Sequence, residues 1–559
     1  MNTIKIFCEN TDSHIEVAGG TTLLEIARDF APRLDFKPVC ALVNNKVEGL
    51  SYPLFAPKRV EFVPAHSSIG RDVYIRSLCM MLYKAVRDLH PGLTLRIELS
   101  ISRGYYCRLL DVDGHAVHMD EEGVGEIKAA MINIVESDIP FKRKEKTTEE
   151  VIDIFQREGL QDKVGLLETI NHLYTAYYQL GDTADSYYMP LVPSSSCLDV
   201  FDLRPYKSGF LLLGRDSENP ESPAIPIMQE KMYHAFTEHL KFNKVIKVSN
   251  VGELNRAVER KMTSDLINVA EAMHNKLLGR ISDDIAERRR NGDAGIVLIA
   301  GPSSSGKTTS CKRLAIQLMT NLIVPKMISL DDYFVDRDKT PRDHTGDYDF
   351  ESLYALDLER FNSDLERLLA GEEINLPTYS FEFGKRVETD RPLKLEANDV
   401  LIIEGIHGLN PELTGTIDPR HLYKIYVSAL TTLRIDDHNW ISTSDNRLLR
   451  RIVRDHKYRH IPAAETIRRW PSVRRGEEKW IFPFAENADA TFNSSLIFEL
   501  GVMKDYAEPL LRGVPHGQKQ YAVANRLLKF LDLFTTIPAD QVPSTSLLRE
   551  FLGGSSFHY

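Results

Sequence analysis

The first residues of the chain follow an alternating apolar pattern that predicts a small β-rich unit. Ile4, Ile6 and Cys8 fall on one face of the pattern, and Ile15 and Val17 repeat it after a polar turn. A period of two is typical of a half-buried hairpin. The predicted elements are a hairpin over 4–17, a helix over 23–30 and strands over 39–43 and 60–63, which together make a β-grasp.

Helical and strand patterns are mixed in the next part of the chain, which predicts an α+β unit. Helices are predicted over 74–89, 127–137 and 148–158, and strands over 95–99 and 104–111. Clustered Pro and Ser predict a loop-rich stretch over 183–219 and a linker at 221–226. A helical stretch that forms a long, charged, amphipathic connector is predicted over about 251–290.

Strands and helices alternate after residue 294, which is the order that a parallel α/β sheet requires. The predicted strands cover 295–300, 326–330, 400–404 and 422–427, and helices near the end cover 522–534 and 547–552. The fold class is therefore multidomain α/β and α+β. Its predicted parts are a β-grasp over 1–65, an α+β unit over 66–235, a helical connector over 236–292, a parallel sheet over 293–500 and a helical extension over 501–559.

Composition limits the classes of function. The 69 basic and 80 acidic residues give a net charge of −11, which argues against a protein that coats nucleic acid. None of the six cysteines forms a Cys-x-x-Cys pair, so neither a disulfide framework nor a cysteine-based zinc site is indicated. We expect no signal peptide and, without a run of about 18 apolar residues, no membrane span. The expected location is the cytoplasm.

One motif carries specific chemistry. The strand over 296–300 leads into a Gly-x-x-x-x-Gly-Lys-Thr sequence, and a helical pattern over 312–319 follows it. Such loops direct backbone N–H groups at phosphate, while Lys307 reaches the β- and γ-phosphates and Thr308 offers its hydroxyl to Mg²⁺. An ordinary Gly/Ser turn would not need the flanking strand and helix. The predicted phosphate-binding residues are Gly301, Ser303, Ser304, Ser305, Gly306, Lys307, Thr308 and Thr309.

Two acids follow predicted strands at the carboxyl edge of the sheet, where ligands bind in parallel α/β folds. Asp331 can take a proton from an acceptor hydroxyl or hold the metal, and Glu404 is a candidate for the metal shell. The alternatives are a helix cap or exposed turn acid for Asp331 and a plain strand-end acid for Glu404.

The segment 447–480 is strongly basic. It holds eleven basic and four acidic residues, and hence a net charge of +7. Arg447, Arg451 and Arg454 are spaced to share one helix face. Arginines downstream of a phosphate-binding loop suit a lid that neutralises developing charge. A solvated helix face and a nucleic-acid patch are the alternatives.

These motifs, in this order, resemble the uridine kinase and phosphoribulokinase branch of P-loop kinases. The additional stretch over 435–446 is a departure from those kinases. The sequences that carry the resemblance are Asp331-Asp332-Tyr333-Phe334, Tyr348-Asp349-Phe350-Glu351, Pro377-Thr378-Tyr379-Ser380-Phe381 with Arg386, Glu404-Gly405-Ile406 and Arg450-Arg451-Ile452-Val453-Arg454-Asp455.

The resemblance implies roles for these residues. Asp331 would be the general base, with Lys307 and Arg454 as the other catalytic residues. Arg454 and Arg459 would close over the phosphates of ATP. Thr308, Asp331 and Glu404 would hold Mg²⁺ directly or through water, and the acceptor would lie among Asp349, Tyr379, Arg386 and Arg451. Gly384 stands where uridine kinases carry the histidine that reads the pyrimidine, so the acceptor stays open.

The front of the chain resembles two modules of threonyl-tRNA synthetases. Residues 1–65 are similar to a TGS domain, and residues from 66 to about 220 are similar to the editing-type domain. The sequences that carry the second similarity are Leu89-His90-Pro91-Gly92, Gly104-Tyr105-Tyr106 and Pro190-Leu191-Val192-Pro193-Ser194. The positions of the editing ligands fall on Met80, Lys84, Tyr187 and Leu191, so we expect neither editing nor bound zinc.

The sequence therefore predicts an enzyme that uses ATP and Mg²⁺ to phosphorylate a hydroxyl of a small molecule, above all a nucleoside. The alternative is an RNA- or ribosome-associated regulator whose P-loop domain binds ATP without metabolic kinase activity. RNA contact through the front domains fits either. No membrane partner is expected, and a homo-oligomer assembled through the front half stays open.

Overall fold

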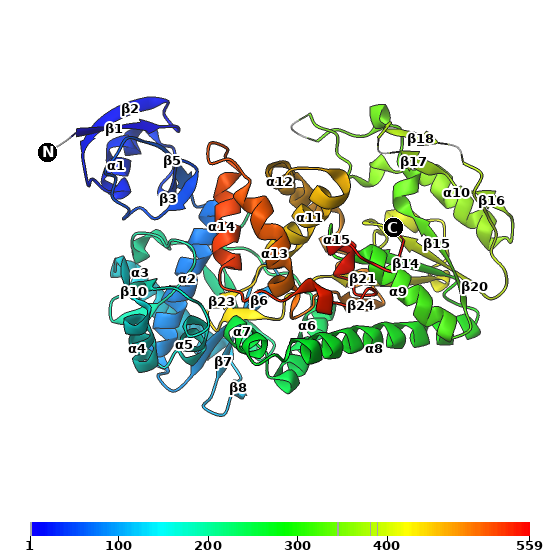
Figure 1. Cartoon of the computed structure of the whole chain (residues 1–559), viewed down its shortest axis with the longest axis horizontal. Coiled ribbons are helices and arrows are strands. Elements are labelled where there is room, and N and C mark those ends of the chain that lie inside the picture. Colours follow the sequence, from blue (N-terminus) through cyan, green and yellow to red (C-terminus); the bar gives the residue numbers. More distant parts are fainter. Residues whose placement is uncertain (1–2, 344–345, 381, 388, 559) are drawn as a thin grey trace.

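The computed structural model describes residues 3–343, 346–380, 382–387 and 389–558 of the 559-residue chain. Its two halves lie side by side along the longest axis (Figure 1). The N-terminal half carries the strands and helices up to β13, and the C-terminal half is built on a second large sheet. Helices α13 and α14 stand between the halves, and the long helix α8 runs along the C-terminal half. Among the described residues, no helix combines the length and apolar character needed to cross a membrane.

The N-terminal unit is a mixed sheet of order β2-β1-β5-β3-β4 covered by helix α1. Thr22 caps α1, and Glu25 completes a capping box, so the predicted hairpin, helix and returning strands are confirmed. The elements are β1 (Thr3–Cys8), β2 (Ser13–Ala18), α1 (Leu23–Phe30), β3 (Pro38–Val43), β4 (Lys46–Glu48) and β5 (Lys58–Pro64).

The second unit wraps two antiparallel sheets around helix α2 (Ser68–Leu89), which is buried along most of its length. One sheet has the order β12-β13-β7-β6, with β8 beside β7, and the other has the order β11-β10-β9. The elements are β6 (Thr94–Ile101), β7 (Gly104–Leu110), β8 (Ala116–Val117), α3 (Glu121–Glu136), β9 (Phe141–Thr147), α4 (Thr148–Glu158), α5 (Gln161–Leu167), β10 (Tyr174–Leu180), β11 (Thr183–Asp185), β12 (Asp202–Tyr206) and β13 (Gly209–Leu213).

The stretch 183–219 is loop-rich as predicted, but it also contains β11 and the β12–β13 hairpin, and every residue of β13 is buried. The helical connector consists of three helices, namely α6 (Glu230–Ile246), α7 (Val251–Glu259) and α8 (Thr263–Arg290). Lys247 and Lys261 adopt positive φ angles of 57° and 59°, which breaks the helical path at each junction.

Five parallel strands form the C-terminal sheet in the order β15-β20-β14-β21-β24. The sequence pattern predicts the first four; β24 is an addition, because its short sequence carries little apolar signal. The elements that build and cover the sheet are β14 (Ile296–Ala300), α9 (Lys307–Thr320), β15 (Val324–Ser329), α10 (Leu358–Leu369), β20 (Asp399–Glu404), β21 (Leu422–Ser428), α11 (Thr443–Arg459), α12 (Ala463–Trp480) and β24 (Ala490–Asn493). Short antiparallel pairs flank it: β16 (Ile374–Asn375) with β19 (Pro392–Leu393), and β17 (Thr378–Ser380) with β18 (Lys385–Val387).

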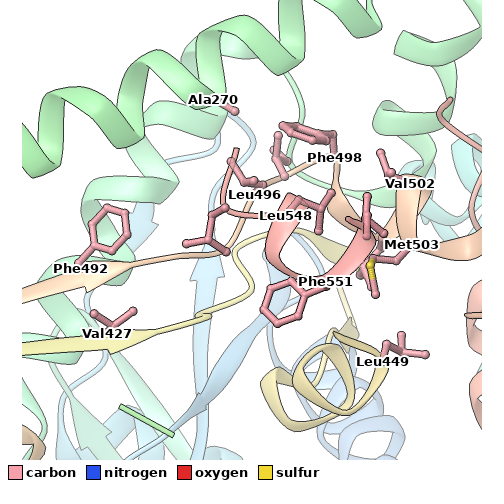
Figure 2. Close-up of a cluster of buried hydrophobic side chains, with 14 of the residues drawn as sticks. Ala270, Val427, Leu449, Phe492, Leu496, Phe498, Val502, Met503, Leu548 and Phe551 are labelled. Carbon is pink, nitrogen blue, oxygen red and sulfur yellow. The ribbon is translucent and has the colours of Figure 1, made fainter. Parts of the chain in front are cut away.

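The last helices belong to the same core as the sheet. These are α13 (Glu499–Arg512), α14 (Tyr521–Leu531) and α15 (Arg549–Leu552). Figure 2 shows Leu548 near Phe498 and Met503, and these side chains belong to one buried cluster with Leu449, Phe492 and Phe551. Helices α6 and α13 run through the boundaries predicted at 235/236 and 500/501, so neither boundary separates two independent cores.

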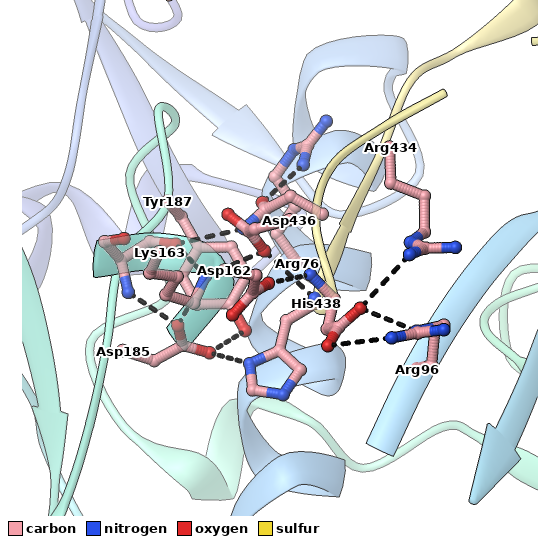
Figure 3. A network of polar contacts seen from close by, with 12 residues as sticks. Arg76, Arg96, Asp162, Lys163, Asp185, Tyr187, Arg434, Asp436 and His438 are labelled. Carbon is pink, nitrogen blue, oxygen red and sulfur yellow. Dashed lines mark hydrogen bonds and ion pairs between the residues drawn. The ribbon is translucent and has the colours of Figure 1, made fainter. Parts of the chain in front are cut away.

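A small hairpin from the C-terminal half inserts into the N-terminal half. It consists of β22 (Arg434–Asp436) and β23 (Asn439–Trp440) and corresponds to the additional stretch noted in the sequence. The Lys163 ammonium lies 2.8 Å from both Asp185 and Asp436, and His438 Nδ1 lies 2.9 Å from Asp185 (Figure 3). Arg434 pairs with Glu98 at 2.8 Å. Side chains from both halves thus share one buried ionic network.

Lys163 is the residue whose removal should damage this network most. Its side chain is 1% exposed, so Lys163→Met leaves Asp185 and Asp436 short of a buried counter-charge. We expect the free energy of unfolding to fall by about 3–5 kcal/mol. Urea denaturation measures the change. Lys146→Met, which breaks an exposed pair with Glu150, should cost less than about 1 kcal/mol, and equal effects would contradict the prediction.

Candidate functional site

The loop between β14 and α9 has the shape that binds phosphate, and glycine is required at both ends of it. A Cβ on Gly301 would lie 2.0 Å from the carbonyl oxygen of Val427, and Gly306 has a φ of +84°. The loop leads directly into α9, whose first N–H groups have no partner within the helix. Backbone donors and a helix N-terminus therefore converge, as an anion site requires.

The outer side of this loop is held by buried arginines. Arg447 donates to the carbonyl of Ser303 at 3.0 Å, and Arg450 donates to that of Ser304 at 3.4 Å. The two side chains are 1% and 0% exposed and are neutralised by Glu477 and Glu499. The prediction that Arg447 belongs to a mobile lid is therefore wrong, because a fully buried, paired guanidinium cannot swing over a ligand.

Three predicted site residues meet at the inner side of the loop. Thr308 Oγ1 donates to Glu404 Oε2 at 3.2 Å, which joins the start of α9 to the end of β20. Lys307 Nζ donates to the carbonyl of Pro302 at 3.3 Å and so stays folded on the loop. A hydroxyl and carboxylate oxygens are ligands that Mg²⁺ prefers, so this donor set fits the metal.

Asp331 lies next to this group, in the turn that follows β15 (Leu330–Tyr333). The surrounding protein raises the pKa of the Asp331 carboxyl, while the charges of Lys307, Arg459 and Arg454 lower it. Desolvation likewise raises the pKa of Glu404 to about 7, against the opposing charge of Lys307. Ser329, at the end of β15, pairs with Glu404 in the sheet, so the turn that holds Asp331 begins beside Glu404.

The other predicted arginines gather around one carboxylate on α11. Asp455 contacts Arg451 at 3.3 Å, Arg454 at 2.9 Å and Arg459 at 3.4 Å. Arg451 also donates to Ser303 Oγ at 2.8 Å. Arg451 therefore contacts the phosphate-binding loop, and Arg454 and Arg459 share its carboxylate partner Asp455.

The remaining predicted acceptor residues make other contacts. Arg386 donates to Asp357 at 2.8 Å, and Asp349 accepts from the N–H of Glu351 at 3.2 Å. The Tyr379 ring packs against Phe334 with centroids 5.5 Å apart. Each of these three contacts is made with a residue outside the phosphate-binding loop, and Phe381 of the same motif lies outside the described residues.

Sequence reasoning missed three glutamates at this site. Glu477 accepts from the N–H of Ser303 at 3.0 Å, and Glu550 accepts from Thr309 Oγ1 at 2.6 Å. Glu351 packs on α12 so closely that a Cβ on Gly476 would lie 2.4 Å from the Cβ of Glu351. Desolvation and the charge of Glu477 raise the pKa of Glu351 to about 7. Glu351 was visible in a motif, but nothing local marks Glu550.

Comparisons with known proteins match the N-terminal and the C-terminal regions of the chain to different proteins. Residues 296–496 match the model of the Phosphoribulokinase / Uridine kinase family. The N-terminal region is similar to a threonine--tRNA ligase from Desulforamulus reducens, with 34% identity over 34% of this chain and 29% of the relative. Uridine kinase-like protein 5 from Arabidopsis thaliana is 31% identical over 29% of this chain and 30% of its own length.

Among solved structures, "a Possible Uridine Kinase" from Bacillus stearothermophilus is 20% identical, with a TM-score of 0.26, over 38% of this chain and 100% of that chain. The chain spans about three tenths of the length of the curated relatives it matches. It therefore joins a segment similar to threonine–tRNA ligases to a segment of the kinase family type.

Glu351 gives a pH-dependent prediction for stability. Its pKa rises from 4.5 to about 7 on folding, so the folded state holds a proton that the unfolded state releases, and stability falls as the pH rises between these values. Glu351→Gln should remove this loss, so that above pH 7 the free energy of unfolding of the variant exceeds that of the parent by about 1–3 kcal/mol. Denaturation at several pH values measures it, with the exposed Glu359→Gln as control. Parallel pH profiles for parent and Glu351→Gln would contradict the prediction.

Proposed function

We propose that this protein is a kinase that transfers a phosphoryl group from ATP to a hydroxyl of a small molecule, with a nucleoside as the first acceptor to test. The observation that carries the proposal is the Thr308–Glu404 pair at the phosphate-binding loop, with Lys307 folded on that loop and the turn of Asp331 beginning beside Glu404. The family match over residues 296–496 supports a small-molecule kinase.

The site residues divide the work of transfer. Asp331 accepts the proton of the acceptor hydroxyl. The oxygen of that hydroxyl bonds to the γ-phosphorus of ATP while the bond from this phosphorus to the bridging oxygen breaks, and ADP leaves. Lys307 exchanges the carbonyl of Pro302 for phosphate oxygens. Arg454 and Arg459 offset charge on the transferred group. Thr308, Glu404 and Asp331 would hold Mg²⁺, which supplies further charge neutralisation when bound.

The acceptor side favours a broad search for substrates. Gly384 has a φ of +64°, and a Cβ there would lie 2.6 Å from the Arg337 guanidinium. Arg337 therefore fills the space next to the position where related uridine kinases carry a base-reading histidine. Sugars and polyols belong in the panel together with nucleosides, because this half of the site departs from the uridine kinase pattern.

The catalytic assignment is tested with Lys307→Ala and Asp331→Asn. Loss of the general base should lower the rate of ADP release about 10²–10⁴-fold with the best acceptor. Lys339→Ala and Asp338→Asn, on an exposed part of the following loop, are the matched controls and should keep full activity. Full activity in Asp331→Asn would remove Asp331 from the mechanism.

A second candidate function, RNA binding by the N-terminal half, rests on strand β9. This strand is at the edge of its sheet, and every residue after Phe141 is exposed. Its basic residues are Lys142, Arg143, Lys144 and Lys146. Charged residues also protect edge strands from aggregation, so exposure alone does not separate the two roles.

Salt dependence separates these roles. If β9 binds RNA phosphates, alanine at Lys142, Lys144 and Lys146 should weaken binding of a transfer RNA. Each lysine that pairs with a phosphate should account for about one unit in the slope of log affinity against log salt, so the variant should show a shallower slope. Lys339→Ala and Lys394→Ala provide the control in the other half. Binding that stays the same in the β9 variant assigns the strand to edge protection.

A further inference from the structure

The C-terminal segment of the chain lies directly on the phosphate-binding loop. Leu547, which precedes α15, packs so closely on Gly306 that a Cβ there would lie 2.7 Å from a Leu547 methyl carbon. The Arg450 guanidinium lies over the Phe551 ring, with its central carbon 5.2 Å from the ring centre. The segment thus contacts both the loop and one of the arginines that hold it.

Glu550 of this segment occupies a donor that phosphate would use. Its Oε2 accepts from the backbone N–H of Thr309 at 3.2 Å and from Thr309 Oγ1 at 2.6 Å. Thr309 is the third residue of α9, and the hydrogen bonds within the helix begin only with Ser310, which donates to Gly306. The Thr309 N–H is therefore one of the helix-start donors that P-loops direct at nucleotide phosphates.

The same carboxylate adds negative charge to the site. Its contact residue, Thr309, directly follows the predicted metal ligand Thr308 in the chain. An incoming polyphosphate would meet this charge as well as a donor already engaged. A carboxylate and a phosphate cannot share a single N–H with full strength, so their binding there is competitive.

We propose, on the premise that the loop binds ATP, that Glu550 is an internal competitor of the nucleotide phosphates and sets the affinity of this site. The helix itself stays in place, because Leu547, Leu548, Phe551 and Leu552 are all buried. Only the Glu550 side chain, which is partly exposed, turns away when nucleotide binds. Glu550 is thus an affinity-determining residue supplied by the C-terminal segment.

The test compares full-length protein with E550Q, which keeps the shape of the side chain and removes its charge. Isothermal titration calorimetry with adenosine 5′-(β,γ-imido)triphosphate and Mg²⁺ should give a Kd about tenfold lower for E550Q. Inorganic tripolyphosphate should show the same gain, since the competition is for phosphate. The matched control is E508Q, on the exposed face of α13, where Glu508 contacts Arg512, and its Kd should equal that of the parent.

The outcomes distinguish this inference from the proposed function. Equal Kd values for the parent and E550Q overturn the inference but leave the nucleotide site in place. Weaker binding by E550Q also overturns it and makes Glu550 a ligand of the bound nucleotide or metal. Absence of binding by both proteins overturns the nucleotide site itself. If E550Q melts at a lower temperature than the parent, E550D, which withdraws the carboxylate while keeping its charge, is measured, and it must show the same direction of change.

Discussion

The buried ionic network around Lys163 is the interaction on which the arrangement of the two halves depends. Asp185 from the N-terminal half accepts from both Lys163 and His438, and Asp436 of the inserted hairpin completes the set. A buried charge left without its partner is very costly, so the hairpin fits in one position only. The rings of His438 and Trp440, both buried, pack at tilted angles against Tyr83 and Tyr105 in the same region.

The hairpin occupies the region where the resemblance would place an editing site. Tyr187, one of the four positions expected to have lost a metal ligand, donates to the same Asp185 that His438 contacts. Lys84 lies next to Tyr83 in the chain and pairs with Asp182. Tyr187 and Lys84 therefore pair with carboxylates of the N-terminal half, and Asp185 links Tyr187 to His438 of the hairpin.

The position of the hairpin matters because α11 follows it directly. The first turns of α11 carry Arg447 and Arg450, which hold the carbonyls of the phosphate-binding loop. Two of the arginines in the strongly basic segment 447–480, Arg447 and Arg450, are thus internal, while most of its other basic residues are exposed. Glu477 neutralises Arg447, and Glu499, from outside the segment, neutralises Arg450. The charge counted along this segment overstates its basic surface, because the count does not include Glu499 of α13, which neutralises Arg450.

Local sequence signals predicted the parts of the fold whose cause is local. The capping box at Thr22 and the glycines of the loop after β14 are such signals. Contacts between distant segments gave no signal: Arg434 meets Glu98 across 336 residues, and Thr309 meets Glu550 across 241. The break at Lys261, inside the helical stretch predicted over 251–290, also had no signal, since lysine favours helices and only the surrounding packing selects a positive φ there.

These long-range contacts converge on α11 and limit what it can do. The start of α11 follows the inserted hairpin, and arginines on its buried face donate hydrogen bonds to the phosphate-binding loop. Helix α15 packs along α11 through Phe551. Releasing the whole helix as a lid would expose Arg447 and Arg450 together with the apolar residues around them. Motion that accompanies ligand binding is therefore confined to side chains at its open end, where Arg454 and Arg459 share Asp455 and can exchange that carboxylate for phosphate.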